Sequence, residues 1–283
     1  MTKITFIIDS CMDNESAVAL GLAAEETSAN VFYMKYTPFL QDEEAAWPID
    51  PGSETGPVVY FGSINLAQLI NRYTRWLPGC FAQFDYYKWS YYSNYISEFL
   101  WNSEYVMYPY GYFRKNTKWI SSNIAGIHES GALFVRPDTG CKSFTGQVVR
   151  NEDDLRYLDT RAKPSNLVVV SQVSVPETEW RFFCSKQGVI TGSQYRRQGK
   201  LEVEESDVVP HGAVVFCSNV IGSLQDFPEE LFVIDIGVDS DGNYGVIEMN
   251  SFSCSGIYAC KADLIISAAA SAAERLWKEM YVQ

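Results

Sequence analysis

The chain of 283 residues has few histidines, no closely spaced cysteine pair and no excess of basic charge. Its two histidines, His128 and His211, stand far from any recognisable Ser/Asp constellation, so catalysis by a histidine-activated nucleophile is not predicted. The seven cysteines include no C-x-x-C motif, which argues against a zinc site or a disulfide framework. Scattered cysteines of this kind are typical of a reducing compartment, so we expect a cytoplasmic protein.

The charge balance and the hydropathy of the chain exclude further classes of protein. A formal net charge of −13 leaves no basic surplus to neutralise a phosphate backbone, so we expect no nucleic-acid partner and no binding to acidic membranes. No apolar run reaches the length of a transmembrane helix. The apolar run near the N-terminus is too short for a signal peptide and is expected to form a strand. Any bound nucleotide must therefore be held by a local cluster of basic residues.

Alternating strand and helix patterns predict a small parallel sheet in the first part of the chain. Strands are expected at 3–9, 31–36 and 58–62, and helices at 14–26 and 64–76. From residue 133 the pattern changes to short strands, which are expected at 133–137, 147–149, 167–173, 179–184 and 188–195, with helices at 151–161, 211–221 and 262–281. This change of pattern predicts a second, mostly antiparallel region.

Between residues 81 and 119, 16 of the 39 residues are aromatic. Aromatic side chains bury large areas, so a packed core layer or interface is the favoured interpretation. The alternatives are a wall that recognises a substrate or a platform on which bases stack.

The most informative segment is an acidic hairpin near the C-terminus. Two apolar strands, Phe232-Val-Ile-Asp-Ile-Gly and Gly245-Val-Ile-Glu-Met-Asn, are joined by a turn rich in Asp, Gly and Asn. Glu248 and Asn250 are two residues apart, so they share one strand face, and the hairpin folds Asp235 back against that face. Oxygen ligands without Cys or His suit a hard divalent cation such as Mg²⁺. The alternative is that these residues only form the turn and a charged edge strand, but polar groups on a central strand need a reason.

A Gly-flanked loop provides a second candidate site. The segment 136–146 is not a Walker A motif, because it lacks the Gly-Lys pair followed by Ser or Thr and does not run into a helix. Its backbone and Lys142 could still lie over a triphosphate, and Arg136 could contact the same anion in a bidentate manner. The alternative is an ordinary hairpin loop with a solvated lysine.

Two further groups follow the strand at 167–173. The chain leaves that strand at Gln172 and Val173, where backbone groups could face a purine edge and Glu177 or Glu179 could face ribose hydroxyls. Glu179 and Arg181 could equally form a simple ion pair. Arg196 ends the next strand, where an inward guanidinium would suit a developing anion; the alternative is a solvated arginine.

Taken in order, these motifs resemble the ATP-grasp superfamily, which includes glutathione synthetase and D-alanine–D-alanine ligase. The segments Val135-Arg-Pro…Lys142-x-Phe-x-Gly and Glu179-Trp-Arg-Phe-Phe are similar to a clade of small ATP-grasp proteins found in phage and bacterial genomes. The resemblance implies an α/β (α+β) protein in which two α+β subdomains, 106–176 and 177–283, clamp ATP. A parallel α/β pre-ATP-grasp domain at 1–105, with an aromatic-rich connector, would precede them.

The resemblance also implies roles for single residues. Asp235, Glu248 and Asn250 would bind Mg²⁺. The other implied contacts are Arg136 and Lys142 with the phosphates, Gln172 and Val173 with adenine, Glu177 or Glu179 with ribose, and Arg181 and Arg196 with the γ-phosphate and an acyl phosphate. Lys118 is expected to be the upstream phosphate-binding lysine, with Lys115 as the other candidate. The sequence departs from the usual pattern by having Gln172 in place of Glu and Arg136 in place of Lys.

The implied activity is that of an ATP- and Mg²⁺-dependent carboxylate–amine ligase that forms an amide through an acyl phosphate. Its partners would be a small-molecule or peptide carboxylate and an amine. The alternatives are a phosphotransferase of the same fold or a catalytically inactive nucleotide-binding protein.

Overall fold

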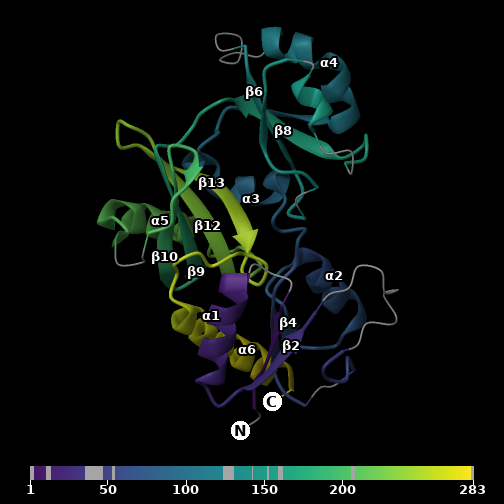
Figure 1. Cartoon of the computed structure of the whole chain (residues 1–283), viewed down its shortest axis with the longest axis vertical. Coiled ribbons are helices and arrows are strands. Elements are labelled where there is room, and N and C mark those ends of the chain that lie inside the picture. The colour runs from purple at the N-terminus through teal and green to yellow at the C-terminus, as the bar shows by residue number, and fades with distance from the viewer. Residues whose placement is uncertain are drawn as a thin grey trace.

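A computed structural model describes residues 3–10, 14–35, 47–52, 55–123, 131–141, 143–151, 153–158, 162–204 and 208–281. Three β-sheets follow one another along the long axis of the molecule, one parallel and two antiparallel (Figure 1). The N-terminal sheet lies at one end, and the sheet that carries α4 lies at the other (Figure 1).

The N-terminal sheet has four parallel strands in the order β2-β1-β3-β4. Its elements are β1 (Thr5–Asp9), α1 (Asn14–Glu25), β2 (Asn30–Met34), β3 (Val58–Phe61), α2 (Ile64–Tyr73) and β4 (Pro78–Gly79). All five residues of β1 are buried, as expected for a central strand covered on both faces. The predicted parallel sheet is therefore confirmed.

The aromatic-rich stretch forms the connector to the next sheet. It contains α3 (Trp89–Ile96), the 3₁₀ turn η2 (Ser97–Phe99), β5 (Tyr105–Pro109) and the first half of α4 (Tyr110–Asn123). Trp89 and Tyr92 are fully buried against the second antiparallel sheet and α5. Core packing is thus the main role of this stretch, although Tyr112 and Trp119 of α4 stay exposed.

The first antiparallel sheet has the order β5-β8-β6-β7, with β6 (Leu133–Pro137), β7 (Gln147–Val149) and β8 (Leu167–Gln172). Leu133 and Val135 of β6 pack with Phe113 and Ile120 of α4 in one core. Side chains alternate along a strand, so Phe134 and Arg136 point to the opposite face. Helix α4 therefore covers one face of this sheet and leaves the other face free for a site.

The predicted helix at 151–161 is wrong for the part of that segment that the structure describes. Only a single 3₁₀ turn, η3 (Asp154–Arg156), forms there. Within this described part, Leu155 and Leu158 are the only buried apolar side chains, which is too few for the apolar stripe that stabilises a surface helix.

The second antiparallel sheet has the order β11-β10-β9-β12-β13. Its elements are β9 (Thr178–Ser185), β10 (Gly188–Arg197), β11 (Lys200–Leu201), α5 (His211–Ser223), β12 (Leu231–Val238), β13 (Tyr244–Ser251) and α6 (Ala262–Tyr281). Both faces are buried: Phe182 packs toward α5, and Phe183 packs toward α6 and the N-terminal sheet. Helices α6 and α1 lie side by side (Figure 1). None of the described helices is long and apolar enough to cross a membrane.

Candidate functional site

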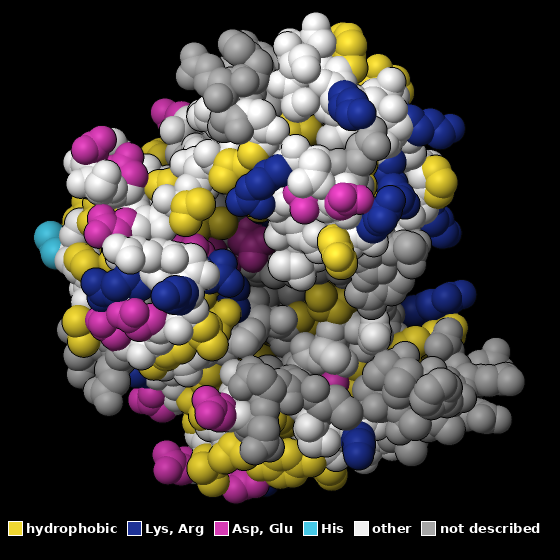
Figure 2. All heavy atoms as spheres, turned by 45° about the horizontal axis from the view of Figure 1, so that its top comes forward, with side chains coloured by type: hydrophobic (Ala, Val, Ile, Leu, Met, Phe, Trp, Pro, Cys, Tyr) yellow, Lys and Arg dark blue, Asp and Glu magenta, His cyan; other side chains and the backbone are white. Residues whose placement is uncertain are grey.

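A cleft of about 300 Å³ lies between the two antiparallel sheets. One wall comes from β6 and the loop that follows it, and the other from β9, β10, β12 and β13. Figure 2 shows acidic side chains set back in a hollow near the centre of the molecule. The lining residues are Phe134, Arg136, Pro137, Thr139, Phe144, Thr145, Gly146, Glu179, Arg181, Tyr195, Arg196, Asp235, Ile247, Glu248 and Tyr258.

The acidic hairpin brings its three predicted oxygen donors together. Asp235 and Glu248 are direct cross-strand partners of β12 and β13. The Asn250 amide donates hydrogen bonds to Glu248 Oε1 at 3.0 Å and to Asp235 Oδ2 at 3.3 Å. A register shift follows Asp235, so the ladder is locally bent at this point. One strand pair therefore holds two carboxylates and an amide within a few ångströms of one another.

Arg181 neutralises the most buried of these carboxylates. Its Nε and one terminal nitrogen donate to Asp235 at 2.8 and 2.7 Å, and the other terminal nitrogen donates to the Gly256 carbonyl at 3.1 Å. Asp235 is only 1% exposed, so it depends on this bidentate contact. Burial opposes the charge on Arg181, but the Asp235 charge and hydrogen bonds outweigh it and raise the pKa of the guanidinium.

Arg136 reaches across the cleft from the opposite sheet. It donates to Glu248 Oε2 at 2.9 Å and to the Ile247 carbonyl at 3.0 Å. Burial opposes its charge, but the nearby Tyr92 and Glu248 outweigh that effect and raise the pKa of Arg136. The two sheets are thus tied together by an ion pair at the acidic hairpin.

A third charged group lies at the β9–β10 side of the cleft. Glu179 accepts a hydrogen bond from the Tyr195 hydroxyl at 2.5 Å and lies 3.6 Å from a terminal nitrogen of Arg196. Burial raises the pKa of Glu179, against the opposing effects of Tyr195 and Arg196. The Arg196 Nε is buried without a hydrogen-bond partner, so this guanidinium retains donor capacity for a ligand.

Of the predicted nucleotide contacts outside the charged clusters, few lie in the cleft. Gln172 ends β8, and Val173 and Glu177 belong to the linker between the two sheets. None of these three is among the lining residues of the cleft. Lys142 lies outside the described residues.

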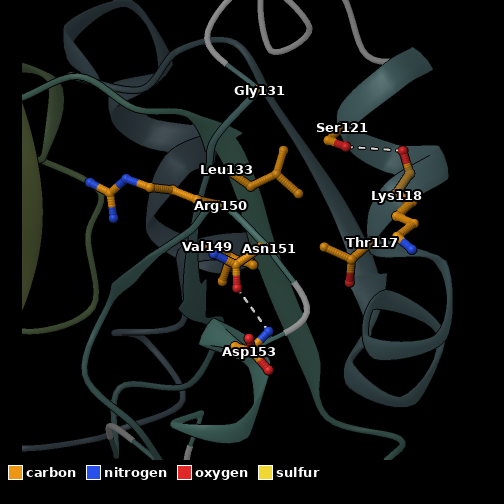
Figure 3. Close-up of a pocket in the computed structure, with 9 residues that line it drawn as sticks. All are labelled: Thr117, Lys118, Ser121, Gly131, Leu133, Val149, Arg150, Asn151 and Asp153. Carbon is orange, nitrogen blue, oxygen red and sulfur yellow. Dashed lines mark hydrogen bonds between the residues drawn. The ribbon is translucent and has the colours of Figure 1, made fainter.

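Lys118 lies on the other side of the first sheet. It belongs to α4, which covers the face opposite Arg136. Figure 3 shows it beside a separate pocket of about 380 Å³, across from Leu133 and Val149. The sheet therefore separates Lys118 from the acidic hairpin, and Lys115 belongs to the same helix.

The sequence predictions missed two aromatic residues of the cleft. Tyr195 and Tyr258 stack at 4.9 Å with nearly parallel rings, and Arg181 lies 5.6 and 5.0 Å from the two ring centroids. Tyr258 has a positive φ of 50°, which is uncommon for a residue of this size. Tyr195 could have been found from its place next to Arg196, whereas no sequence signal marks Tyr258.

The oxygen-rich cradle fits a hard cation. Two carboxylates and an amide that can rotate to present its oxygen form the donor set that Mg²⁺ prefers. No group of three His, Cys, Asp or Glu side chains that could hold a metal ion is found in the described part of the chain. The set therefore depends on Asn250 as its third member.

Two antiparallel sheets that enclose a charged cleft, preceded by a parallel α/β domain, define the ATP-grasp class of folds. D-cycloserine synthetase DcsG has the same fold, with a TM-score of 0.63 and 11% identity over 96% of this chain and 99% of that chain. The D-alanine–D-alanine ligase of Bacillus anthracis, complexed with ATP, aligns with a TM-score of 0.58 and 13% identity over 99% and 100%. The ATP-grasp ligase PsnB, complexed with a minimal precursor, aligns with a TM-score of 0.59 and 12% identity over 95% and 99%.

The sequence places the chain more narrowly within this class. Residues 114–268 match the model of an ATP-grasp domain family, the second family of its clade, and the chain belongs to this family. The predicted superfamily and fold class are therefore confirmed. A comparison with the curated proteins finds no match.

Proposed function

We propose that this protein is an ATP- and Mg²⁺-dependent carboxylate–amine ligase that works through an acyl phosphate. The observation that carries the proposal is the convergence of Asp235, Glu248 and Asn250 opposite Arg136 in the cleft between the two sheets. Membership of an ATP-grasp family and the fold shared with amide-forming ligases support it. Several relatives by fold act on small molecules or on a precursor peptide, which supports substrates of that kind.

The cleft offers distinct groups for the parts of the nucleotide. Arg136 would contact the phosphates from the β6 wall, and we propose that Lys142 joins it from the following loop. Glu179, in the β9 wall, would accept a hydrogen bond from the ribose. Gln172, Val173 and Glu177 lie where the chain passes from one sheet to the other, so they would have to contact the base through the backbone. Lys118 is left out of this proposed site.

The acidic cradle would hold Mg²⁺, which when bound neutralises phosphate charge and orients the triphosphate. The rest of the work falls to the arginines, because positioning and charge stabilisation dominate phosphoryl transfer. Arg181 holds Asp235 in place, and Arg196 presents unused donor capacity toward the cleft.

The proposed reaction has two steps. A carboxylate oxygen of the substrate attacks the γ-phosphorus, the bond from that phosphorus to the bridging oxygen breaks, and ADP leaves. The amine nitrogen then attacks the acyl carbon of the mixed anhydride, the carbon–oxygen bond breaks, and phosphate leaves as the amine gives up a proton. Arg196 is placed to stabilise the negative charge that develops on the transferred group.

Product analysis tests the proposal. The protein is incubated with ATP, MgCl₂ and pools of amino acids and short peptides, and ADP, phosphate and new masses are measured. We expect ADP, phosphate and an amide, and we expect all three to be lost in Glu248→Gln. The control is Asp241→Asn, which changes an exposed turn carboxylate of the same hairpin and should leave turnover unchanged. A phosphorylated product, or nucleotide binding without ADP formation in every pool, would contradict the proposal.

A further inference from the structure

We propose that Trp89 is a positioning residue for Arg136, so that the aromatic connector contributes to the nucleotide site. The inference rests on the proposed function, because it assigns Arg136 to the phosphates. Its physical basis is that the indole of Trp89 fixes the plane in which the Arg136 guanidinium faces the acidic hairpin.

The contact joins two segments far apart in sequence. The Arg136 guanidinium lies 5.0 Å from the centroid of the Trp89 ring. Two of its nitrogens are committed to Ile247 and Glu248 across the cleft. A flat cation held from behind by a ring and in front by two acceptors has few orientations left.

The Trp89 ring is itself immobilised. Trp89 is 1% exposed and contacts the rings of Tyr92 and Tyr105 edge-on, at 5.6 and 5.3 Å between centroids. Tyr105 belongs to the first antiparallel sheet, and Tyr92 packs toward the second. The indole therefore lies where the two sheets and the connector meet.

The start of α3 is fixed to the strand segment that carries Arg136. Asp138 lies two residues after Arg136 and accepts hydrogen bonds from the Ser90 amide at 2.7 Å and the Ser90 hydroxyl at 2.9 Å. The Asp138 carbonyl accepts another from the Trp89 amide at 2.9 Å. Backbone and side chain thus hold Trp89 and Arg136 in register, which is more than core packing requires.

This arrangement accounts for an arginine at position 136. A lysine could keep the charge, but it could not stack a planar group on the indole while donating to both Ile247 and Glu248. Removing the indole should leave the charge present but less well oriented. We therefore expect Trp89→Leu to weaken binding of a non-hydrolysable Mg-ATP analogue by about tenfold, the scale of a desolvated cation–π contact.

A double-mutant cycle separates positioning from packing. Calorimetry gives the analogue affinity of the wild type, Trp89→Leu, Arg136→Gln and the double variant, and urea unfolding gives their stability. The proposal predicts that Trp89→Leu costs about tenfold in affinity with Arg136 present, but less than about twofold in the Arg136→Gln background. Trp89→Phe keeps a ring, so it should recover most of the affinity, and it replaces the leucine variant in the cycle if that variant does not fold.

The matched control is Trp76→Leu, which removes a tryptophan of similar burial, 5% exposed, from the N-terminal domain. It should lower stability and leave the affinity unchanged. An equal loss of affinity in both Arg136 backgrounds, or with Trp76→Leu, would overturn the proposal while leaving the proposed ligase function intact. A wild type that binds no analogue at all would overturn both.

Discussion

At the scale of single residues, each carboxylate of the cleft is matched by its own arginine. Asp235 is paired with Arg181, Glu248 with Arg136, and Glu179 with Arg196. A buried ion pair adds little net stability compared with an apolar pair, but removing one member leaves an uncompensated charge. The acidic wall can therefore be built in the folded protein only because these arginines accompany it.

Arg181→Leu should therefore destabilise the protein strongly. It leaves the buried Asp235 without its partner, and we expect a loss of about 3 kcal/mol in the free energy of unfolding. Arg197→Leu is the control, because Arg197 is 43% exposed and pairs with Glu202 and Glu204 at the surface, where less than about 1 kcal/mol is expected. Urea unfolding measures both, and equal losses would speak against a buried pair at Asp235.

Glu229 should make stability depend on pH. Burial raises its pKa to about 7, although the Tyr87 hydroxyl and the Gln83 amide donate hydrogen bonds to the carboxylate. The folded state therefore binds this proton more tightly than the unfolded chain does. The stability that it contributes is fully present below the unfolded pKa and is lost as the pH rises through about 7.

Glu229→Gln should remove this part of the pH dependence. Thermal melts between about pH 5 and pH 8 should show a flatter profile for this variant than for the wild type. Glu98→Gln, at an exposed position, should keep the wild-type slope. Parallel profiles for the wild type and Glu229→Gln would contradict the assignment.

At the scale of elements, the regular patterns could be predicted and the irregular ones could not. The acidic hairpin, the N-terminal parallel sheet and α6 follow directly from alternation, turn residues and helical spacing. The segment at 151–161 has charges at helical spacing but few apolar side chains, so tertiary contacts decide its shape. Similarly, the spacing between Arg136 and Trp89 carries no signal, because only the folded chain brings α3 behind β6.

The face of a strand decides which basic residue can meet a nucleotide. Lys118 lies behind the first sheet, and Arg136 lies in front of it. Lys118→Ala should leave the affinity for a Mg-ATP analogue within about twofold of the wild type, whereas Arg136→Ala should weaken it at least about tenfold, as expected for a charged hydrogen-bond partner. Calorimetry decides the matter, and the reverse order would place the phosphates on the α4 side.

At the scale of the whole molecule, the three sheets do not form three independent bodies. Phe6 and Phe61 of the N-terminal sheet share one core with Phe183, Val233 and the apolar face of α6. The first antiparallel sheet and α4 have a core of their own. The N-terminal domain and the second subdomain therefore form one packed unit, and the first subdomain is joined to it through the connector and the cleft.

A fragment of residues 106–283 should consequently fail to fold stably. Without Phe6, Phe61 and their neighbours, one face of the second sheet and α6 would be exposed to water. We expect aggregation or a loss of cooperative unfolding by circular dichroism, compared with the full chain. A fragment that unfolds cooperatively at the wild-type temperature would show that the shared core is dispensable.

The central claim is that the acidic hairpin and Arg136 together hold one Mg-nucleotide between the two sheets. Calorimetric titration of a non-hydrolysable ATP analogue, with and without Mg²⁺, into the wild type and Glu248→Gln tests it most directly. We predict one site per wild-type chain, with an affinity that Mg²⁺ raises at least about tenfold, and little of this Mg²⁺ effect in Glu248→Gln. An affinity that neither Mg²⁺ nor the substitution changes would contradict the claim.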